Sequence, residues 1–184
     1  QAIVKLKDMR ENYRKNPNAS EQEFWGGLSL YAQSKNLPLA HVQNTFNEYK
    51  NNRAGNDVST FYLGNKSDNE KLNELSTPEA VIAKHPNLTQ EQAVYWSGRV
   101  SSQIDQNNRA VALQQKQLED DAKDAVNEMK ADIETGLIPS EDVIKSRLAR
   151  VKGTGKESEF VQYSGALVEV QQFMRLGADE REAY

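Results

Sequence analysis

The sequence predicts an all-α protein of about seven helices, and three observations lead to that fold class. First, between Thr89 and Gly136 there is no proline, and the only glycine is Gly98. A single helix over about residues 89–135, roughly 70 Å long at 1.5 Å per residue, is therefore expected. Second, apolar residues in most other segments recur at steps of three and four, which is the helical period. Third, no segment alternates apolar and polar residues as a half-buried strand does.

The first two helices have clear starts and stops. Apolar residues recur at helical spacing from Ile3 to Tyr13, and Pro17 then ends the pattern. Ser20 and Glu23 form a capping box, because a serine at the cap and a glutamate three residues later can each bond the other's backbone N–H. A second helix is therefore expected to begin just after Ser20.

A third helix opens at Pro38, which suits a first helical turn, and is expected to stop near Gly55. We therefore expect residues 1–55 to form an N-terminal helical group. Residues 56–76 are rich in Asn, Gly, Ser and Asp, which is typical of a loop, and they are the predicted boundary. Residues 77–184 would then hold the long helix and the C-terminal helices.

A short helix is expected before the long one. Ser76 supplies its cap and Pro78 its first-turn proline, and the pattern stops at His85. Thr89 and Gln92 form a further capping box at the start of the long helix.

The C-terminal region has the helix stop and start signals of a helical hairpin. Gly136 can adopt the left-handed conformation that ends a helix, Pro139 prevents the helix from resuming, and Ser140 caps the next one. Gly153 allows a further turn, and a last helix is expected to end at Gly177. The long helix thus links the N-terminal group to this hairpin group.

Apolar residues are distributed unevenly along the long helix. Both of its ends have an apolar face, but Asp105 to Gln117 is mostly Gln, Asn and charged residues. One hypothesis is an exposed connecting helix between two packed ends, and the sequence favours it. The alternative is an interface helix, in which four residues at strict seven-residue spacing meet a partner along one line, namely Ile104, Val111, Leu118 and Ala125.

Composition limits the classes of function. The 184 residues are 37% hydrophobic, and 23 basic against 27 acidic side chains give a net charge of -4, so there is no general attraction to nucleic acid or anionic lipid. Without cysteine there is no disulfide and no thiolate metal site. No run of about 18 apolar residues predicts a membrane span, and no signal peptide is visible. Both ends look cut from a longer polypeptide.

Several short matches to catalytic motifs fail in context. Residues 153–156 imitate the end of a phosphate-binding loop but lack its earlier glycine and its Ser or Thr. Residues 65–68 spell a GTP-binding tetrad without any phosphate loop. His41 and His85 have no second ligand at metal-binding spacing. We therefore predict no catalytic, cofactor-binding or metal-binding residue, no small-molecule substrate and no enzymatic activity.

Two local charge biases leave alternatives open. The first 15 residues hold five basic and two acidic side chains, whereas residues 116–142 hold nine acidic and three basic ones. Solvated helix faces explain both biases, and complementary ends could instead promote self-association. Four basic residues of the first helix could also contact nucleic acid: Lys5, Lys7, Arg10 and Arg14.

The stretch from Ala131 to Tyr184 carries a family resemblance. It begins with Ala-Asp-Ile-Glu-Thr-Gly-Leu-Ile-Pro, continues with Val-Lys-Gly-Thr from Val151 and closes with Phe-Met-Arg-Leu-Gly-Ala-Asp-Glu-Arg-Glu-Ala-Tyr from Phe173. This stretch resembles helical segments of very large tailed-phage virion proteins, including those that carry a lytic transglycosylase domain elsewhere. The resemblance implies a fragment of an internal or DNA-ejection protein with a structural role. No catalytic residue of that family maps onto this chain.

Three hypotheses of function follow. The first is a non-enzymatic structural or assembly segment of a larger phage or prophage protein, located in the virion or the bacterial cytoplasm, which binds itself or other virion proteins. The second is an accessory region of a peptidoglycan-degrading or other enzyme whose catalytic domain lies outside this chain. The third is a helical module that contacts nucleic acid.

Overall fold

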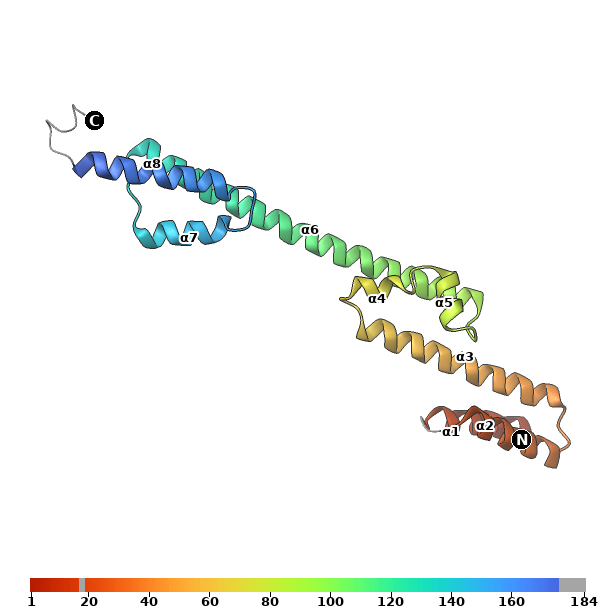
Figure 1. Cartoon of the computed structure of the whole chain (residues 1–184). Helices are drawn as coiled ribbons and strands as arrows, with labels where there is room; N and C mark the ends of the chain where they lie inside the picture. Colours follow the sequence, from red (N-terminus) through yellow and green to blue (C-terminus); the bar gives the residue numbers. More distant parts are fainter. Residues whose placement is uncertain (17–18, 176–184) are drawn as a thin grey trace. The chain divides into compact units, whose positions relative to one another are not determined.

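The computed structural model describes residues 1–16 and 19–175, with side chains placed up to residue 172. Within these residues the chain is entirely helical and has no strand, which confirms the predicted fold class (Figure 1). None of the described helices is both long and apolar enough to cross a membrane. There are eight helices in the described residues rather than seven: α1 (Ala2–Arg14), α2 (Glu21–Ser34), α3 (Leu39–Gly64), α4 (Asn69–Asn73), α5 (Pro78–Lys84), α6 (Gln90–Thr135), α7 (Glu141–Val151) and α8 (Glu157–Arg175).

The chain packs as two units, and the boundary between them falls inside α6. Unit 1 is Gln1–Asn107 and unit 2 is Asn108–Tyr184. The predicted boundary at 56–76 is therefore wrong. The predicted long helix over about 89–135 is confirmed, and it contributes its first part to unit 1 and its last part to unit 2.

In unit 1, α1, α2 and the first half of α3 enclose an aromatic core. Phe24 lies at its centre, with its ring centroid 4.6 Å from those of Tyr13 and Tyr49. Aromatic pairs at this separation stabilise a core beyond the area they bury. The buried members of this core are Leu6, Phe24, Leu28, Ala32, Val42 and Tyr49.

The second half of α3 forms another core of unit 1 with α4, α5 and the start of α6. The predicted loop at 56–76 is mostly helix, because α3 continues past Gly55 to Gly64. The cause is visible in Ala54, Val58 and Tyr62, which are spaced four residues apart and all buried. Burial of this apolar face outweighs the loop preference of the Asn, Gly and Ser residues on the outer face. Only short turns separate α3, α4 and α5.

Side-chain amides join α3 to the beginning of α6. Asn51 Nδ2 donates to Gln92 Oε1 at 2.7 Å, and Gln92 Nε2 donates back to Asn51 Oδ1 at 3.0 Å. Gln92 also completes the predicted capping box with Thr89, which is confirmed by two reciprocal bonds of 2.9 and 3.2 Å. The cap of α5 differs from the prediction: it is Thr77, whose Oγ1 accepts from Ala80 N at 3.2 Å, and not Ser76.

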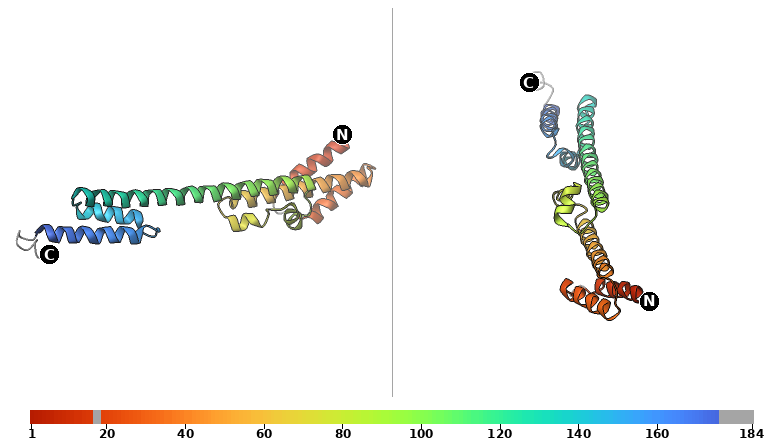
Figure 2. Two further views of the ribbon diagram at one scale, coloured as in Figure 1. Left: turned by 90° about the horizontal axis from the view of Figure 1, so that it is seen from above. Right: turned by 90° about the vertical axis from the view of Figure 1, so that its right-hand side faces the viewer.

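Unit 2 combines the last part of α6 with α7 and α8. These three helices lie side by side (Figure 2) and share one core. Its buried members are Ala122, Ala125, Val126, Met129, Val151, Phe160 and Leu167. The predicted end of the last helix at Gly177 lies outside the described residues.

Candidate functional site at the contact between α6 and α7

The turn from α6 into α7 has the geometry that the sequence predicts. Gly136 has φ +67°, a left-handed conformation that glycine adopts without steric cost. Gly136 N bonds Ile133 O at 3.2 Å, and Leu137 N bonds Asp132 O at 2.9 Å, which together form a Schellman motif. Ser140 Oγ then accepts from Val143 N at 3.4 Å and caps α7. This turn returns α7 along α6.

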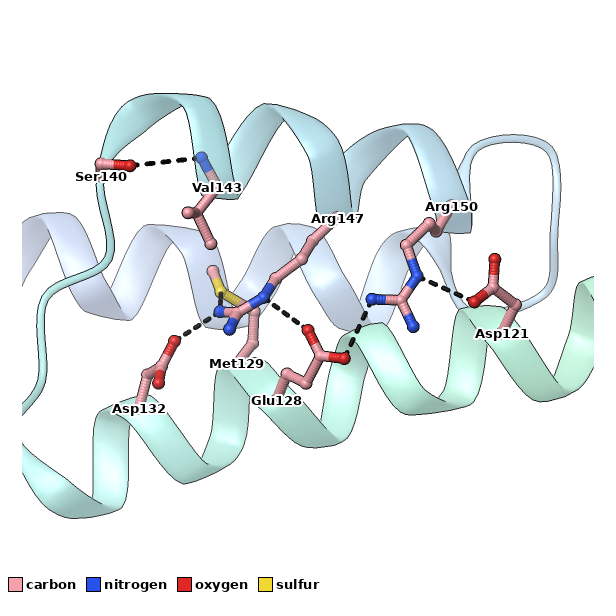
Figure 3. A network of polar contacts seen from close by, with 8 residues as sticks. All are labelled: Asp121, Glu128, Met129, Asp132, Ser140, Val143, Arg147 and Arg150. Carbon is pink, nitrogen blue, oxygen red and sulfur yellow. Dashed lines mark hydrogen bonds and ion pairs between the residues drawn. The ribbon is translucent and has the colours of Figure 1, made fainter.

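Two arginines of α7 bind three carboxylates of α6 (Figure 3). Arg147 Nε donates to Glu128 Oε2 at 2.8 Å, and Arg147 Nη1 donates to Asp132. Arg150 Nη1 donates to Glu128 Oε1 at 3.0 Å, and Arg150 Nε donates to Asp121 at 3.0 Å. Each oxygen of Glu128 thus accepts from a different arginine. We call these five residues the α6–α7 ion-pair network.

The network is most protected from water at Arg147, whose side chain is 13% exposed, and at Asp132, whose side chain is 15% exposed. Hydrogen bonds from Arg150 and then from Arg147 lower the pKa of Glu128, against the opposing effect of burial. The hydrogen bond to Glu128 raises the pKa of Arg150. Each charged group of the network forms an ion pair with an oppositely charged member of it. This arrangement suits attachment of α7 to α6. The lowered pKa of Glu128 does not suit proton transfer near neutral pH, for which a carboxyl pKa near neutral is needed.

Apolar contacts support the ion pairs. Val151 at the end of α7 is fully buried in the core that also holds Met129 of α6 and Phe160 of α8. On the side of α8, Lys130 Nζ lies 3.0 Å from Glu159 and 5.1 Å from the ring centroid of Tyr163. Both shorter helices are therefore attached to α6 by an ion pair as well as by core packing.

Sequence reasoning missed this site. The charge pattern predicts a solvated face for the acidic stretch that includes Asp121 and Glu128, but Asp121 binds Arg150, and Glu128 binds both Arg147 and Arg150. The signal was present in the spacing: positions 121, 128 and 132 lie on one face of a helix, and two arginines three residues apart follow a helix-reversing turn. Because ion pairs within unit 2 partly compensate this acidic charge, less of it is available to attract the basic N-terminal helix of a second copy.

The four predicted interface residues have different environments. Ile104 is partly buried and packs against the core of unit 1. Ala125 is 0% exposed in the core of unit 2, so this residue cannot contact a partner. Val111 and Leu118 are 66% and 49% exposed. Every residue from 108 to 121 is exposed, so only these two of the four remain available along the line.

Two of the basic residues of α1 already form ion pairs within the chain. Arg10 forms ion pairs with Glu48 and Glu11, and Arg14 bonds Glu11 at 2.9 Å. Lys5 and Lys7 are exposed. The predicted nucleic-acid surface therefore consists of two exposed lysines and two arginines that already have acidic partners.

The two histidines show no metal-binding arrangement within the described residues, where no group of three His, Asp or Glu side chains is placed to hold an ion. His85 lines a cleft of about 580 Å³ in unit 1 together with Lys50, Arg53 and Asp57. Burial and then the neighbouring Lys84 lower the pKa of His85, and Asp57 opposes them. The mixed signs of charge in this cleft favour neither an anion nor a cation.

Comparisons with protein-family models, with curated proteins and with solved structures find no match to this chain.

Proposed function

We propose that this chain is a non-enzymatic structural segment of a larger tailed-phage or prophage virion protein, and that it acts through helix packing. The observation that carries this proposal is the stretch 108–121 of α6, in which every residue is exposed although the residues on either side enter a core. A helix that continues without packing between two packed ends has the character of a connector. The class of virion protein rests on the resemblance of the stretch from Ala131 onward.

The exposed stretch can remain helical without packing. Ala110, Ala112 and Lys116 are strong helix formers, and Gln115 Nε2 donates to Glu119 one turn later at 3.1 Å. Its mostly polar surface also suits permanent contact with water. These properties support a solvated connector ahead of an interface.

A virion role predicts where the chain is found. Peptides of this sequence are expected in purified particles of the phage or induced prophage that encodes it, in amounts comparable to other minor structural proteins. Mass spectrometry of gradient-purified particles, with the infected-cell lysate as the reference sample, measures this. Peptides confined to the lysate and absent from the particles would contradict the assignment.

The state of association distinguishes the connector from the alternative interface. The exposure of Val111 and Leu118, seven residues apart on one face, is the observation that favours an interface. For a connector, sedimentation velocity at several protein concentrations is expected to give a constant monomer mass. Val111→Asp and Leu118→Asp are then expected to leave that mass unchanged, because both side chains already face water.

Leu113 provides the matched control for this experiment. It is also exposed, but it lies two residues from Val111 and therefore about 200° around the helix. The connector hypothesis would be wrong, and the interface hypothesis right, if a concentration-dependent dimer is lost in Val111→Asp and Leu118→Asp but kept in Leu113→Asp.

A further inference from the structure

In unit 1, two exposed cationic side chains lie around the buried ring of Tyr62, and the exposed ring of Tyr95 lies beside one of them. Tyr62 lies near the end of α3 and Lys66 in the turn after it, and Tyr95 and Arg99 belong to α6. The Arg99 guanidinium lies 5.3 Å from the ring centroid of Tyr62 and 5.9 Å from that of Tyr95. Lys66 Nζ lies 5.5 Å from the centroid of Tyr62. We call these four residues the aromatic–cationic patch.

The two cations of the patch have no acidic partner among the residues that the structure describes. Among the described residues, neither Lys66 nor Arg99 forms an ion pair, and both are exposed. Because both are placed around the same ring at 5.5 and 5.3 Å, their charges are at most about 11 Å apart. Successive phosphates of a nucleic acid strand lie closer together than this. Two positive charges within this limit can both reach phosphates of one strand.

Hydrogen bonds hold the Tyr62 side chain and the backbone of Lys66 against α6. Tyr62 Oη donates to Gln103 Oε1 at 3.1 Å, and Gln103 Nε2 donates to Asn107 Oδ1 at 3.0 Å. Asn107 Nδ2 in turn donates to the carbonyl oxygen of Lys66 at 2.8 Å. The end of α3 is thereby held against α6. A ligand would meet a surface that is already ordered, which reduces the entropy lost on binding.

Tyr95 provides an accessible ring within the patch. It is 54% exposed, its ring stands edge-on against Trp96 at 5.3 Å, and its Oη accepts from Arg99 Nη1 at 2.7 Å. A ring held in this way and open to solvent can stack with a nucleobase, while the cations beside it bind the phosphates. This combination requires unpaired bases, which a duplex does not offer.

We propose that the aromatic–cationic patch binds single-stranded nucleic acid, with Tyr95 stacking on a base and with Lys66 and Arg99 binding phosphate oxygens. This activity is additional to the structural role. It also differs from the predicted contact through α1, because the arginines of α1 already have acidic partners, whereas Lys66 and Arg99 form no ion pair with a described residue.

Fluorescence anisotropy of a labelled oligothymidylate of about 15 nucleotides tests the proposal with the whole chain, beginning at about 50 mM salt. We expect saturable binding that Tyr95→Ala weakens at least about fivefold, as loss of one stacked base does. Arg99→Gln and Lys66→Gln should also weaken binding, and each should reduce the slope of log affinity against log salt by about 0.7. The same sequence as a duplex should bind more weakly.

Lys35→Gln is the control, since it removes one equal charge in unit 1. Lys35 is exposed and forms no ion pair with any described residue. It follows the end of α2, so the whole of α3 separates it along the chain from Lys66, which follows the end of α3. No binding at about 50 mM salt, or equal losses in Lys35→Gln and the patch variants, would overturn the proposal. Binding of duplex as tight as of single strand, with no effect of Tyr95→Ala, would overturn it as well. The variants change exposed side chains, and circular dichroism verifies that each one is folded.

Discussion

Phe160→Ala is expected to destabilise unit 2 by about 3–5 kcal/mol while unit 1 retains its own unfolding transition. Phe160 is fully buried and is the largest of the described buried side chains in the unit 2 core, which also holds Met129, Val151 and Leu167, so alanine would leave a cavity there. The substitution also removes the favourable free energy of burying the ring. A core this small has little capacity to collapse around the cavity. Units of this size are marginally stable, so the loss is a large part of the total.

The positions of the tryptophans make this prediction measurable. Trp25 and Trp96, the two tryptophans of the chain, both belong to unit 1, so tryptophan fluorescence reports unfolding of unit 1. Far-UV circular dichroism reports helix in both units. In urea, Phe160→Ala should lower the midpoint of part of the dichroism change and leave the fluorescence midpoint unchanged.

Val161→Ala is the matched control, because Val161 is the exposed neighbour on the same helix. It is expected to change the free energy of unfolding by about 0.5 kcal/mol at most. If Phe160→Ala shifts the fluorescence and dichroism midpoints equally, the two units unfold as one, and their description as separately packed bodies is wrong.

Arg147→Met is expected to destabilise unit 2 by about 2 kcal/mol. Methionine keeps much of the aliphatic length of arginine but removes the donors to Glu128 and Asp132. Asp132 then remains a largely buried carboxylate without its arginine partner, and this unpaired charge is the main cost. The value is below that of a fully buried pair because Glu128 can still bond Arg150 and reach water. Denaturation in urea, followed by circular dichroism, measures it.

Lys145→Met is the control for Arg147→Met. Lys145 lies on the same helix and pairs with Glu141, but both side chains are exposed, so the loss is expected to be below about 0.5 kcal/mol. An equal effect of the two substitutions would mean that helix propensity and not the ion-pair network decides the stability of α7.

The pH dependence of unit 2 provides a second readout of the network. The pKa of Glu128 is lower in the folded chain than in the unfolded chain, because Arg150 and Arg147 bind its ionised form. Its contribution to stability is therefore complete above the unfolded pKa and is lost as the pH falls through the folded pKa. Arg147→Met should reduce this acid dependence of the midpoint, and Lys145→Met should not.

Much of the local structure was predictable because it depends on interactions within a few residues. The capping boxes at Ser20 and Thr89 and the caps at Gly136 and Ser140 are all confirmed. Each of these features satisfies backbone groups at a helix end, so the sequence pattern and the structure are linked directly. The error in the cap of α5 was a shift of one residue, from Ser76 to Thr77.

The extent of α3 shows where local reasoning fails. Asn, Gly and Ser residues after Asn51 favour turns in isolation, and they led to a loop prediction. The helix continues because Val58 and Tyr62 are buried against α4, α5 and α6, which lie later in the chain. The side chain of Asn51, a turn former by propensity, is instead used to bond Gln92. Tertiary packing thus overrides propensity at these positions.

The sequence by itself determined that the protein is helical, that one helix runs without interruption over about 46 residues, and that the middle of this helix lacks an apolar face. Only the tertiary structure decided which side chains of that helix remain available. It buried Ala125, left Val111 and Leu118 exposed, and brought Arg147 and Arg150 onto carboxylates up to 29 residues earlier in the chain. The physical reason is that periodicity identifies a face, whereas pairing and burial depend on which distant element covers it.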